Sequence, residues 1–273
     1  MDFSYILFNT LIYGSIGLVM SSYFAYGKFI NFSIGAFVGM MGYILYGVVN
    51  QWFTVQNIFM ICSLIIIYRW VNRALIKYFP NTKQRDHVGL VITIGLNVFV
   101  QNMVNYVYGP SSIGLRLFTT TPWILLIMIL VISWITYYLL KGSLIGKVYT
   151  SIEENTQTTD SLGIKSTKLL HQLFGWLFWL LVVNALFIIN ETNLKATDGV
   201  FYLIKWIWIM ILVGVGKKEY IFVWALLYVL LEYFLFITLW LPIAYKETLV
   251  LIIILWVLLW KPEWLFMIRR RKI

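Results

Sequence analysis

Long apolar runs, separated by short polar segments, fill most of this 273-residue chain and restrict its fold more than any other feature. A helix that crosses a bilayer needs about 20 apolar residues in a row, and roughly nine stretches approach that length. The pattern predicts an all-α, polytopic membrane protein with about nine transmembrane helices, within a range of roughly 8–10. The runs lie at about residues 5–26, 32–50, 53–71, 88–108, 122–140, 168–190, 200–215, 220–240 and 247–260.

The composition excludes a soluble enzyme and leaves no room for an extramembrane domain. Hydrophobic residues make up 61% of the chain and charged residues 12%, whereas a soluble domain is about half apolar and about a quarter charged. Residues 1–273 are therefore expected to form a single transmembrane domain. One cysteine, Cys62, excludes an intrachain disulfide, and two histidines are too few for a histidine-rich metal centre, so no cofactor or metal is expected.

The basic residues are distributed unevenly between the two sides that nine alternating runs define. The net charge is +10, with 17 Lys and Arg on one side and only Arg116, Lys195 and Lys246 on the other. Because Lys and Arg accumulate in cytoplasmic loops, the N-terminus is predicted outside and the C-terminus in the cytoplasm. The basic tail, residues 261–273, is interpreted as a membrane anchor, and nucleic acid is not an expected partner.

Catalytic motifs are missing from the sequence. The segment 142–147 superficially resembles a phosphate-binding loop, but it has one residue too few between its glycines. In addition, Val148 stands where a Ser or Thr should bind magnesium. No nucleophile elbow and no His-Glu-x-x-His pair is found. The chain is therefore not expected to be an enzyme.

Polar residues inside the apolar runs are the better indication of function, because they are costly in hydrocarbon and tend to face a partner or a cavity. Asn97, Gln101 and Asn105 are spaced i, i+4, i+8, which places them on one helix face. This face predicts either a wet pathway or hydrogen bonding between helices. Lys205 and Glu232 lie well inside two later runs. We expect them to pair and orient two helices, the alternative being a lysine that extends to the membrane surface.

Two polar segments interrupt the apolar pattern on the predicted cytoplasmic side. Residues 26–35, which include Asn31, are either a discontinuous helix at membrane depth or a simple turn. The segment 141–167 is the longest polar stretch. In it, Ser151 is a candidate helix N-cap, with Glu153 and Glu154 in the first turn and Gly163 at the end of the helix. Such a helix would dock a cytoplasmic partner, unless the segment is only a solvated connector.

Short motifs follow one another in a fixed order along nearly the whole chain. They are Leu7-Phe8-Asn9 with Gly14-Ser15; Asn31-Phe32-Ser33-Ile34-Gly35; Ile94-Gly95 with Gln101-Asn102; Gly146-Lys147 with Glu153 and Leu162-Gly163-Ile164; and Gly199 with Lys205 and Gly214-Val215-Gly216, followed by Glu232. In this order and spacing they resemble the permease subunits of the branched-chain amino acid ABC importers, a family that includes sugar and urea permeases.

The resemblance implies a permease subunit of an ATP-driven importer in a bacterial plasma membrane. It would move small amino acids, above all branched-chain ones, by alternating access. The implied partners are cytoplasmic ABC ATPase subunits, a second homologous permease, an extracytoplasmic solute-binding protein and the lipid bilayer. The implied pathway residues are Asn31, Asn97, Gln101, Lys205 and Glu232. The implied ATPase-coupling residues are Glu153, Glu154, Leu162, Gly163 and Ile164.

At several positions the chain departs from the family. Ile34 and Ala36 stand where the family has His and Glu, and large residues fill the seventh and eighth runs, which are glycine-rich in the family. A permease-like membrane scaffold that does not transport is therefore an alternative. A permease for another small solute, such as urea, an amide or a sugar, is a second. A secondary transporter is less favoured, because the chain shows no convincing internal repeat.

Overall fold

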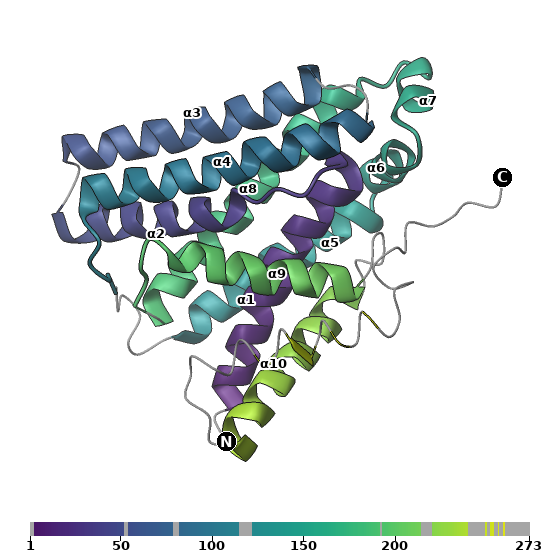
Figure 1. Ribbon diagram of the computed structural model, residues 1–273. Helices are drawn as coiled ribbons and strands as arrows, with labels where there is room; N and C mark the ends of the chain where they lie inside the picture. Colours follow the sequence, from purple (N-terminus) through teal and green to yellow (C-terminus); the bar gives the residue numbers. More distant parts are fainter. Residues whose placement is uncertain are drawn as a thin grey trace. The chain divides into compact units, whose positions relative to one another are not determined.

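The computed structural model describes residues 3–51, 54–78, 82–114, 122–191, 193–213 and 220–239, with isolated positions between 249 and 259. Every named element in these ranges is a helix, and the only β-type contact in them is an isolated bridge between Ile113 and Leu194. The helices, drawn in Figure 1, are α1 Phe3–Ser22, η1 Tyr23–Gly27, α2 Ile34–Gln51, α3 Val55–Tyr78, α4 Thr82–Tyr108, α5 Pro122–Lys141, α6 Leu144–Glu154, α7 Thr156–Ser161, α8 Ser166–Glu191, α9 Asp198–Val213 and α10 Ile221–Leu239. The predicted all-α class is confirmed for this part of the chain.

The helices lie where the apolar runs predict them. The first eight runs correspond in order to α1–α5 and α8–α10. The last run, 247–260, is described only at isolated positions, and the basic tail 261–273 lies outside the described residues. Local signals agree with these bounds. Pro122, for example, begins α5, where its missing N–H removes no helical hydrogen bond.

Four of the described helices are long and apolar enough to cross a membrane. They are Tyr5–Gly27, Val55–Ile76, His87–Tyr108 and Ser166–Asn190. A fifth candidate combines Leu126–Lys141 with Leu144–Glu154 across a bend of 66°, and Ile34–Asn50 and Ile221–Leu235 are shorter apolar helices. The chain thus has several helices of the kind found in multi-pass membrane proteins.

Large apolar side chains are exposed along α3, α4 and α5, as an environment of lipid requires. Ile66, Val91 and Trp134 are between 65% and 69% exposed. Apolar surface of this extent is unusual on a soluble monomer but is favourable against hydrocarbon chains.

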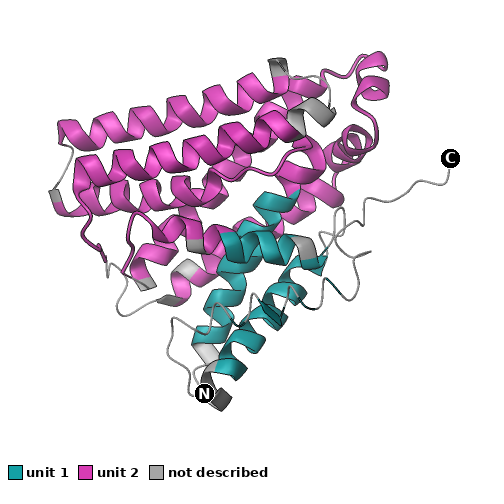
Figure 2. Ribbon diagram, in the orientation of Figure 1, with its two compact units in different colours: residues 1–21, 204–273 teal, residues 22–203 magenta. Residues whose placement is uncertain are grey.

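The chain folds into two compact units, which Figure 2 colours separately. Unit 1 comprises residues 1–21 and 204–273, and unit 2 comprises residues 22–203. The boundaries therefore lie near the end of α1 and within α9. The sequence predicts a single transmembrane domain, and that expectation remains a prediction.

Small residues allow close helix packing in unit 1. A Cβ added at Gly14 would overlap the Phe222 ring, and one at Gly17 would lie 3.2 Å from Ile221 and 3.4 Å from Ile209. Close approach through glycines is typical of membrane helices, whose association depends on van der Waals packing rather than on the hydrophobic effect. These contacts bring α9 and α10 against α1.

Unit 2 is built around α2, which packs against both α4 and α8. At the start of α2, Gly35 lies against the backbone of Gly199 in the first turn of α9. A Cβ at either glycine would overlap the carbonyl oxygen of the other. The two backbones therefore touch without intervening side chains, and neither position has room for another residue type.

Candidate functional site

The five predicted pathway residues are divided between the two units. Asn31, Asn97 and Gln101 belong to unit 2, whereas Lys205 and Glu232 belong to unit 1. The structure thus provides two separate buried polar groups.

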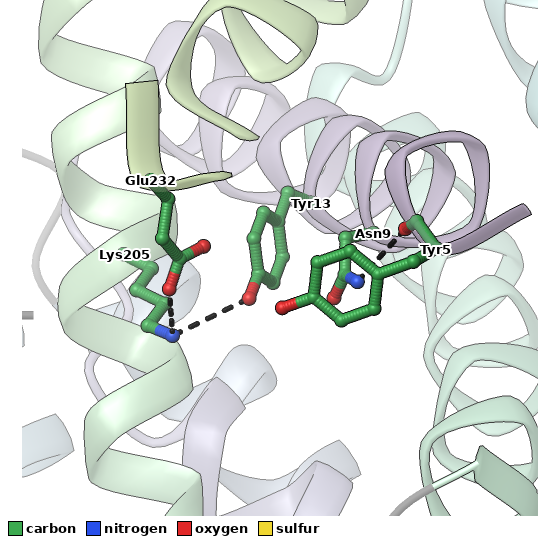
Figure 3. Close-up of polar contacts among 5 residues, drawn as sticks. All are labelled: Tyr5, Asn9, Tyr13, Lys205 and Glu232. Atoms are coloured by element: carbon green, nitrogen blue, oxygen red, sulfur yellow. Dashed lines mark hydrogen bonds and ion pairs between the residues drawn. The ribbon is translucent and has the colours of Figure 1, made fainter. Parts of the chain in front are cut away.

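Lys205 and Glu232 form a buried ion pair in unit 1. The Lys205 Nζ lies 3.2 Å from the Glu232 Oε1 and also donates a hydrogen bond to the Tyr13 hydroxyl at 3.4 Å. The same amine lies 5.6 Å from the centre of the Tyr13 ring, a cation–π distance. Figure 3 shows the three side chains converging from α9, α10 and α1. The predicted pairing of Lys205 with Glu232 is confirmed.

The position of Lys205 excludes the alternative of a lysine extending to the membrane surface. Lys205 is 8% exposed and Glu232 is 2% exposed, so both charged groups are held inside unit 1. A buried charge without a partner is strongly destabilising, whereas a buried pair compensates much of the desolvation. The geometry is that of a cross-link between helices.

Tyr13 is a member of this cluster that the sequence did not indicate. It lies on one face of α1 with Tyr5 and Asn9, at intervals of four residues, and Asn9 donates to the Tyr5 carbonyl at 2.9 Å (Figure 3). The Tyr13 ring meets the Tyr228 ring edge-to-face at 5.9 Å. A tyrosine in an apolar run carries no charge that demands a partner, so only its spacing from Tyr5 and Asn9 could have revealed it.

In unit 2, the π-helical turn η1 and residues 28–33, which form no regular helix, connect α1 to α2, and we call residues 23–33 the broken helix. The choice between a discontinuous helix at membrane depth and a simple turn remains a prediction. The chain leaves α1 through the π-helical turn η1, and Lys28 then adopts a left-handed conformation with φ of 59°. Asn31 is 1% exposed, and its Oδ1 accepts hydrogen bonds from the Ser33 backbone N–H at 3.1 Å and from the Ser33 hydroxyl. Asn31 therefore organises the start of α2. Its predicted place in a pathway remains a prediction.

A line of polar side chains follows the face of α4 that packs inside unit 2. Thr93 donates to the Gly89 carbonyl at 2.7 Å and approaches the Ile30 carbonyl at 3.4 Å, and further along α4 Tyr108 donates to the Asn57 Oδ1 at 2.6 Å. Between them, buried Asn97 Oδ1 and Gln101 Nε2 have no hydrogen-bond partner among the described residues. We call Thr93, Asn97, Gln101 and Tyr108 the α4 seam.

The buried amide atoms of Asn97 and Gln101 favour a wet pathway over hydrogen bonding between helices. Hydrogen bonding between helices would pair the amides of Asn97 and Gln101, but one acceptor and one donor have no partner within the described ranges. Leaving a buried polar atom without a partner costs about 1–3 kcal/mol, so such atoms normally meet water or a ligand. The geometry suits a site for water or a polar solute.

Two tyrosines near the broken helix form a second polar contact that the sequence did not indicate. The Tyr68 hydroxyl donates to the Phe174 carbonyl at 2.8 Å, so the Tyr23 hydroxyl donates to that of Tyr68. The Tyr23 ring also stacks on the Phe174 ring, with centres 4.2 Å apart. This contact fixes η1 against α3 and α8.

The polar segment 141–167 folds into two short helices, and its details differ from the sequence prediction. α6 begins at Leu144, with Ser143 as its N-cap accepting from the Gly146 N–H, and it ends at Glu154. The prediction of Ser151 as the N-cap was wrong, and Glu153 and Glu154 lie in the last turn rather than the first. Starting at Ser143 allows α6 to bury Tyr149 and Ile152, which explains the longer helix.

The end of this segment agrees with the prediction. Asn155 caps α7, and the chain leaves that helix through Leu162 and Gly163, whose φ is +82°. Glycine is favoured in this left-handed conformation, so Gly163 ends a helix as expected, but that helix is α7 and not one that begins at Ser151. Leu162 is 73% exposed and Ile164 is partly buried.

The short helices are attached to the broken helix. The Lys28 Nζ donates to the Glu153 carbonyl at 2.8 Å, which occupies one of the free carbonyls at the end of α6. The Tyr26 ring lies 5.6 Å from the Tyr149 ring, and Tyr149 donates to the Leu169 carbonyl of α8 at 3.2 Å. Movement of α6 would therefore act directly on the segment between α1 and α2.

In the part of the chain that the structure describes, no group of three or more His, Cys, Asp or Glu could hold a metal ion. Compared with known proteins, the chain matches no family model, no curated protein and no solved structure. The support for a function therefore comes from the geometry of the buried polar groups and of α6 and α7, and from the resemblance of the short motifs.

Proposed function

We propose that the chain is the membrane-spanning permease subunit of an ATP-driven ABC importer for small amino acids, branched-chain ones above all. In this proposal it crosses a bacterial plasma membrane about nine times, with the N-terminus outside and the C-terminus in the cytoplasm. It acts with a second, homologous permease, cytoplasmic ABC ATPase subunits and an extracytoplasmic solute-binding protein. The chain itself hydrolyses no ATP.

The observation that carries this proposal is the link between a surface segment and the broken helix. α6 and α7 stand between two long apolar helices, α5 and α8. Their outer residues Glu154, Asn155 and Leu162 are exposed, while Lys28 and Tyr26 hold their inner side. An ATPase that binds the outer residues and displaces α6 would also displace Lys28 and Tyr26, which connect α1 to α2. This is the mechanical coupling that an ATP-driven permease needs.

The two glutamates at the end of α6 support a docking role. A helix C-terminus carries partial negative charge, so acidic residues in its last turn are unfavourable by roughly 0.3–1 kcal/mol each. Glu153 and Glu154 occupy that turn, against the preference of the helix dipole taken alone. Sequence choices that conflict with local stability are expected at functional positions.

The α4 seam supplies a candidate route for the solute. Its ends are hydrogen-bonded, near Ile30 at one end and Asn57 at the other. Its middle has an acceptor on Asn97 and a donor on Gln101 that find no partner in the described part of the chain. Uncharged amides bind polar solutes and water weakly enough to release them. Selectivity for the amino acid would rest mainly with the solute-binding protein.

The packing of unit 2 brings two of the resembling motifs together. Gly35 and Gly199 come from two motifs that are far apart in the sequence, and their backbones touch. Glycines are favoured wherever membrane helices approach closely, and the contact between these two motifs is compatible with the resemblance.

The proposal is tested by purifying the tagged full chain in mild detergent together with its co-expressed candidate ATPase. The informative variant is Glu153→Lys with Glu154→Lys. Lysine is favourable in the last turn of a helix, so α6 should stay folded. Lys195→Glu, a single charge reversal on an exposed residue outside α6 and α7, is the control.

We expect a stoichiometric P-loop ATPase to copurify with the wild type and the control and to be lost from the double variant. ATP-dependent amino-acid uptake into cells should be lost with it. If the chain purifies alone while the ATPase is present in the lysate, the non-transporting scaffold replaces this proposal. Wild-type uptake by the double variant would overturn the docking role of Glu153 and Glu154.

A further inference from the structure

The turn between α5 and α6 carries exposed apolar and basic side chains that the proposed coupling role does not use. α5 ends at Lys141, α6 begins at Leu144, and the two helices are bent by 66° relative to each other. We call residues 134–148 the elbow. Leu144 is 79% exposed and Ile145 is 51% exposed, which is unfavourable for such side chains in water.

The apolar surface of the elbow continues a row on α5. Ile127, Val131, Trp134 and Tyr138 are all exposed and are spaced by three or four residues, so they form one stripe along α5. On the hypothesis that α5 crosses the membrane, this stripe faces lipid. Leu144 and Ile145 are the next exposed apolar residues along the chain.

The aromatic residues indicate the depth of the elbow. Trp134 and Tyr138 stack with ring centres 6.0 Å apart and an angle of 19° between the ring planes. Exposed Trp and Tyr are enriched at the headgroup level of membranes. Lys141 follows Tyr138 by about 5 Å along the helix axis, which places its amine at the level of the lipid phosphates.

The exposed side chains of α6 divide its length into two parts. The beginning exposes Leu144, Ile145 and Lys147, whereas Thr150, Ser151 and Glu154 are exposed towards its end. A helix with apolar residues and lysines side by side is typical of segments that lie in the membrane interface. The acidic end would be repelled by an anionic surface, so only the beginning of α6 suits one.

We propose that the elbow binds the headgroups of anionic phospholipids, with Leu144 and Ile145 inserted between the lipids and Lys141 and Lys147 against the phosphates. Anionic lipids fit because two lysines flank the apolar pair and because the cytoplasmic leaflet carries negative charge. The site lies next to the coupling residues but does not depend on an ATPase. It would fix one end of α6 while leaving the end at Glu154 accessible.

The depth of the elbow is tested on the full chain with Cys62→Ser, reconstituted into vesicles of phosphatidylcholine and phosphatidylglycerol. Spin labels are attached at Leu144→Cys or Ile145→Cys, and at Thr150→Cys or Ser151→Cys as controls from the other part of α6. Collisions with oxygen, which concentrates in lipid, are compared with collisions with a water-soluble nickel complex. We expect the first two labels to favour oxygen and the controls to favour nickel. Labels at 144 and 145 that favour nickel would overturn the proposal.

The lipid preference is tested by binding of short-chain phosphatidylglycerol to the full chain in detergent, with phosphatidylcholine as the reference lipid. Lys141→Gln with Lys147→Gln should weaken phosphatidylglycerol binding by about fivefold per lysine. Lys165→Gln with Lys168→Gln removes the same charge from the same polar segment, but not from the elbow, and should leave binding nearly unchanged. An equal loss in both double variants would indicate diffuse attraction, and equal binding of the two lipids would exclude anionic recognition. Either result would overturn the proposal.

Discussion

The buried polar groups of the two units differ in how their atoms are paired. In unit 1, Lys205, Glu232 and Tyr13 are directed at one another, and the opposite charges meet at 3.2 Å. In unit 2, Asn97 and Gln101 carry no charge and leave an acceptor and a donor without partners among the described residues. In the first arrangement opposite charges compensate each other, whereas in the second the amides leave room for hydrogen bonds to water or a polar solute. We therefore interpret the polar group of unit 1 as a structural cross-link between helices and that of unit 2 as part of a route for a solute.

The largest effect is expected from separating the ion pair. Lys205→Met or Glu232→Gln alone leaves one uncompensated buried charge, and each should destabilise unit 1 by about 3–5 kcal/mol. The double variant removes both charges and should be much less destabilised than either single variant. The loss of stability of each variant is measured from the thermal unfolding midpoint of the full chain in mild detergent. Two mild single variants would show that the pair is not a cross-link.

A smaller effect is expected where α2 meets α9 in unit 2. Gly35→Ala places a Cβ against the Gly199 carbonyl and should destabilise the protein by about 1–3 kcal/mol, because both backbones must shift. Gly95→Ala is the matched control, since a Cβ there meets no atom within 4 Å. Alanine is preferred to glycine in helices, so the control should be neutral or stabilising by about 0.5–1 kcal/mol. If both variants unfold at the same temperature, the close approach is not needed.

The smallest effect on stability is expected in the α4 seam. Asn97→Leu removes an amide whose oxygen has no partner among the residues that the structure describes, so the unfolding midpoint should change by the equivalent of about 1 kcal/mol or less. Solute uptake should nevertheless fall strongly, because the route loses a polar group. Loss of stability comparable to that of Glu232→Gln would show that Asn97 is a structural residue and would remove the contrast between the units.

The sequence predicted the described long helices, the ion pair of unit 1, and Asn97 and Gln101 of the α4 seam. Apolar runs of spanning length leave few alternatives to helices, and two buried charges of opposite sign almost require each other, as Lys205 and Glu232 demonstrate. Tyr13 was missed because an uncharged aromatic residue in an apolar run is compatible with any environment. Its role depends on which helices pack against α1.

The register of α6 could not be predicted from its local signals. Ser143 and Ser151 are both good N-cap residues. The structure starts α6 at Leu144 because that register buries Tyr149 and Ile152 against the broken helix and α8. Tertiary packing therefore decided between two equal local signals, and it moved Glu153 and Glu154 to the end of the helix.

The most direct measurement is the reactivity of single cysteines along α4 towards a charged, membrane-impermeant thiol reagent. Asn97→Cys and Gln101→Cys in the Cys62→Ser chain test the seam, and Val98→Cys, which is 54% exposed on the apolar outer side of α4, is the control. The reagent is applied to membranes that contain the protein. A wet route predicts that positions 97 and 101 react several-fold faster than position 98, which lipid protects. Equal, slow reaction at all three positions would contradict a route along α4.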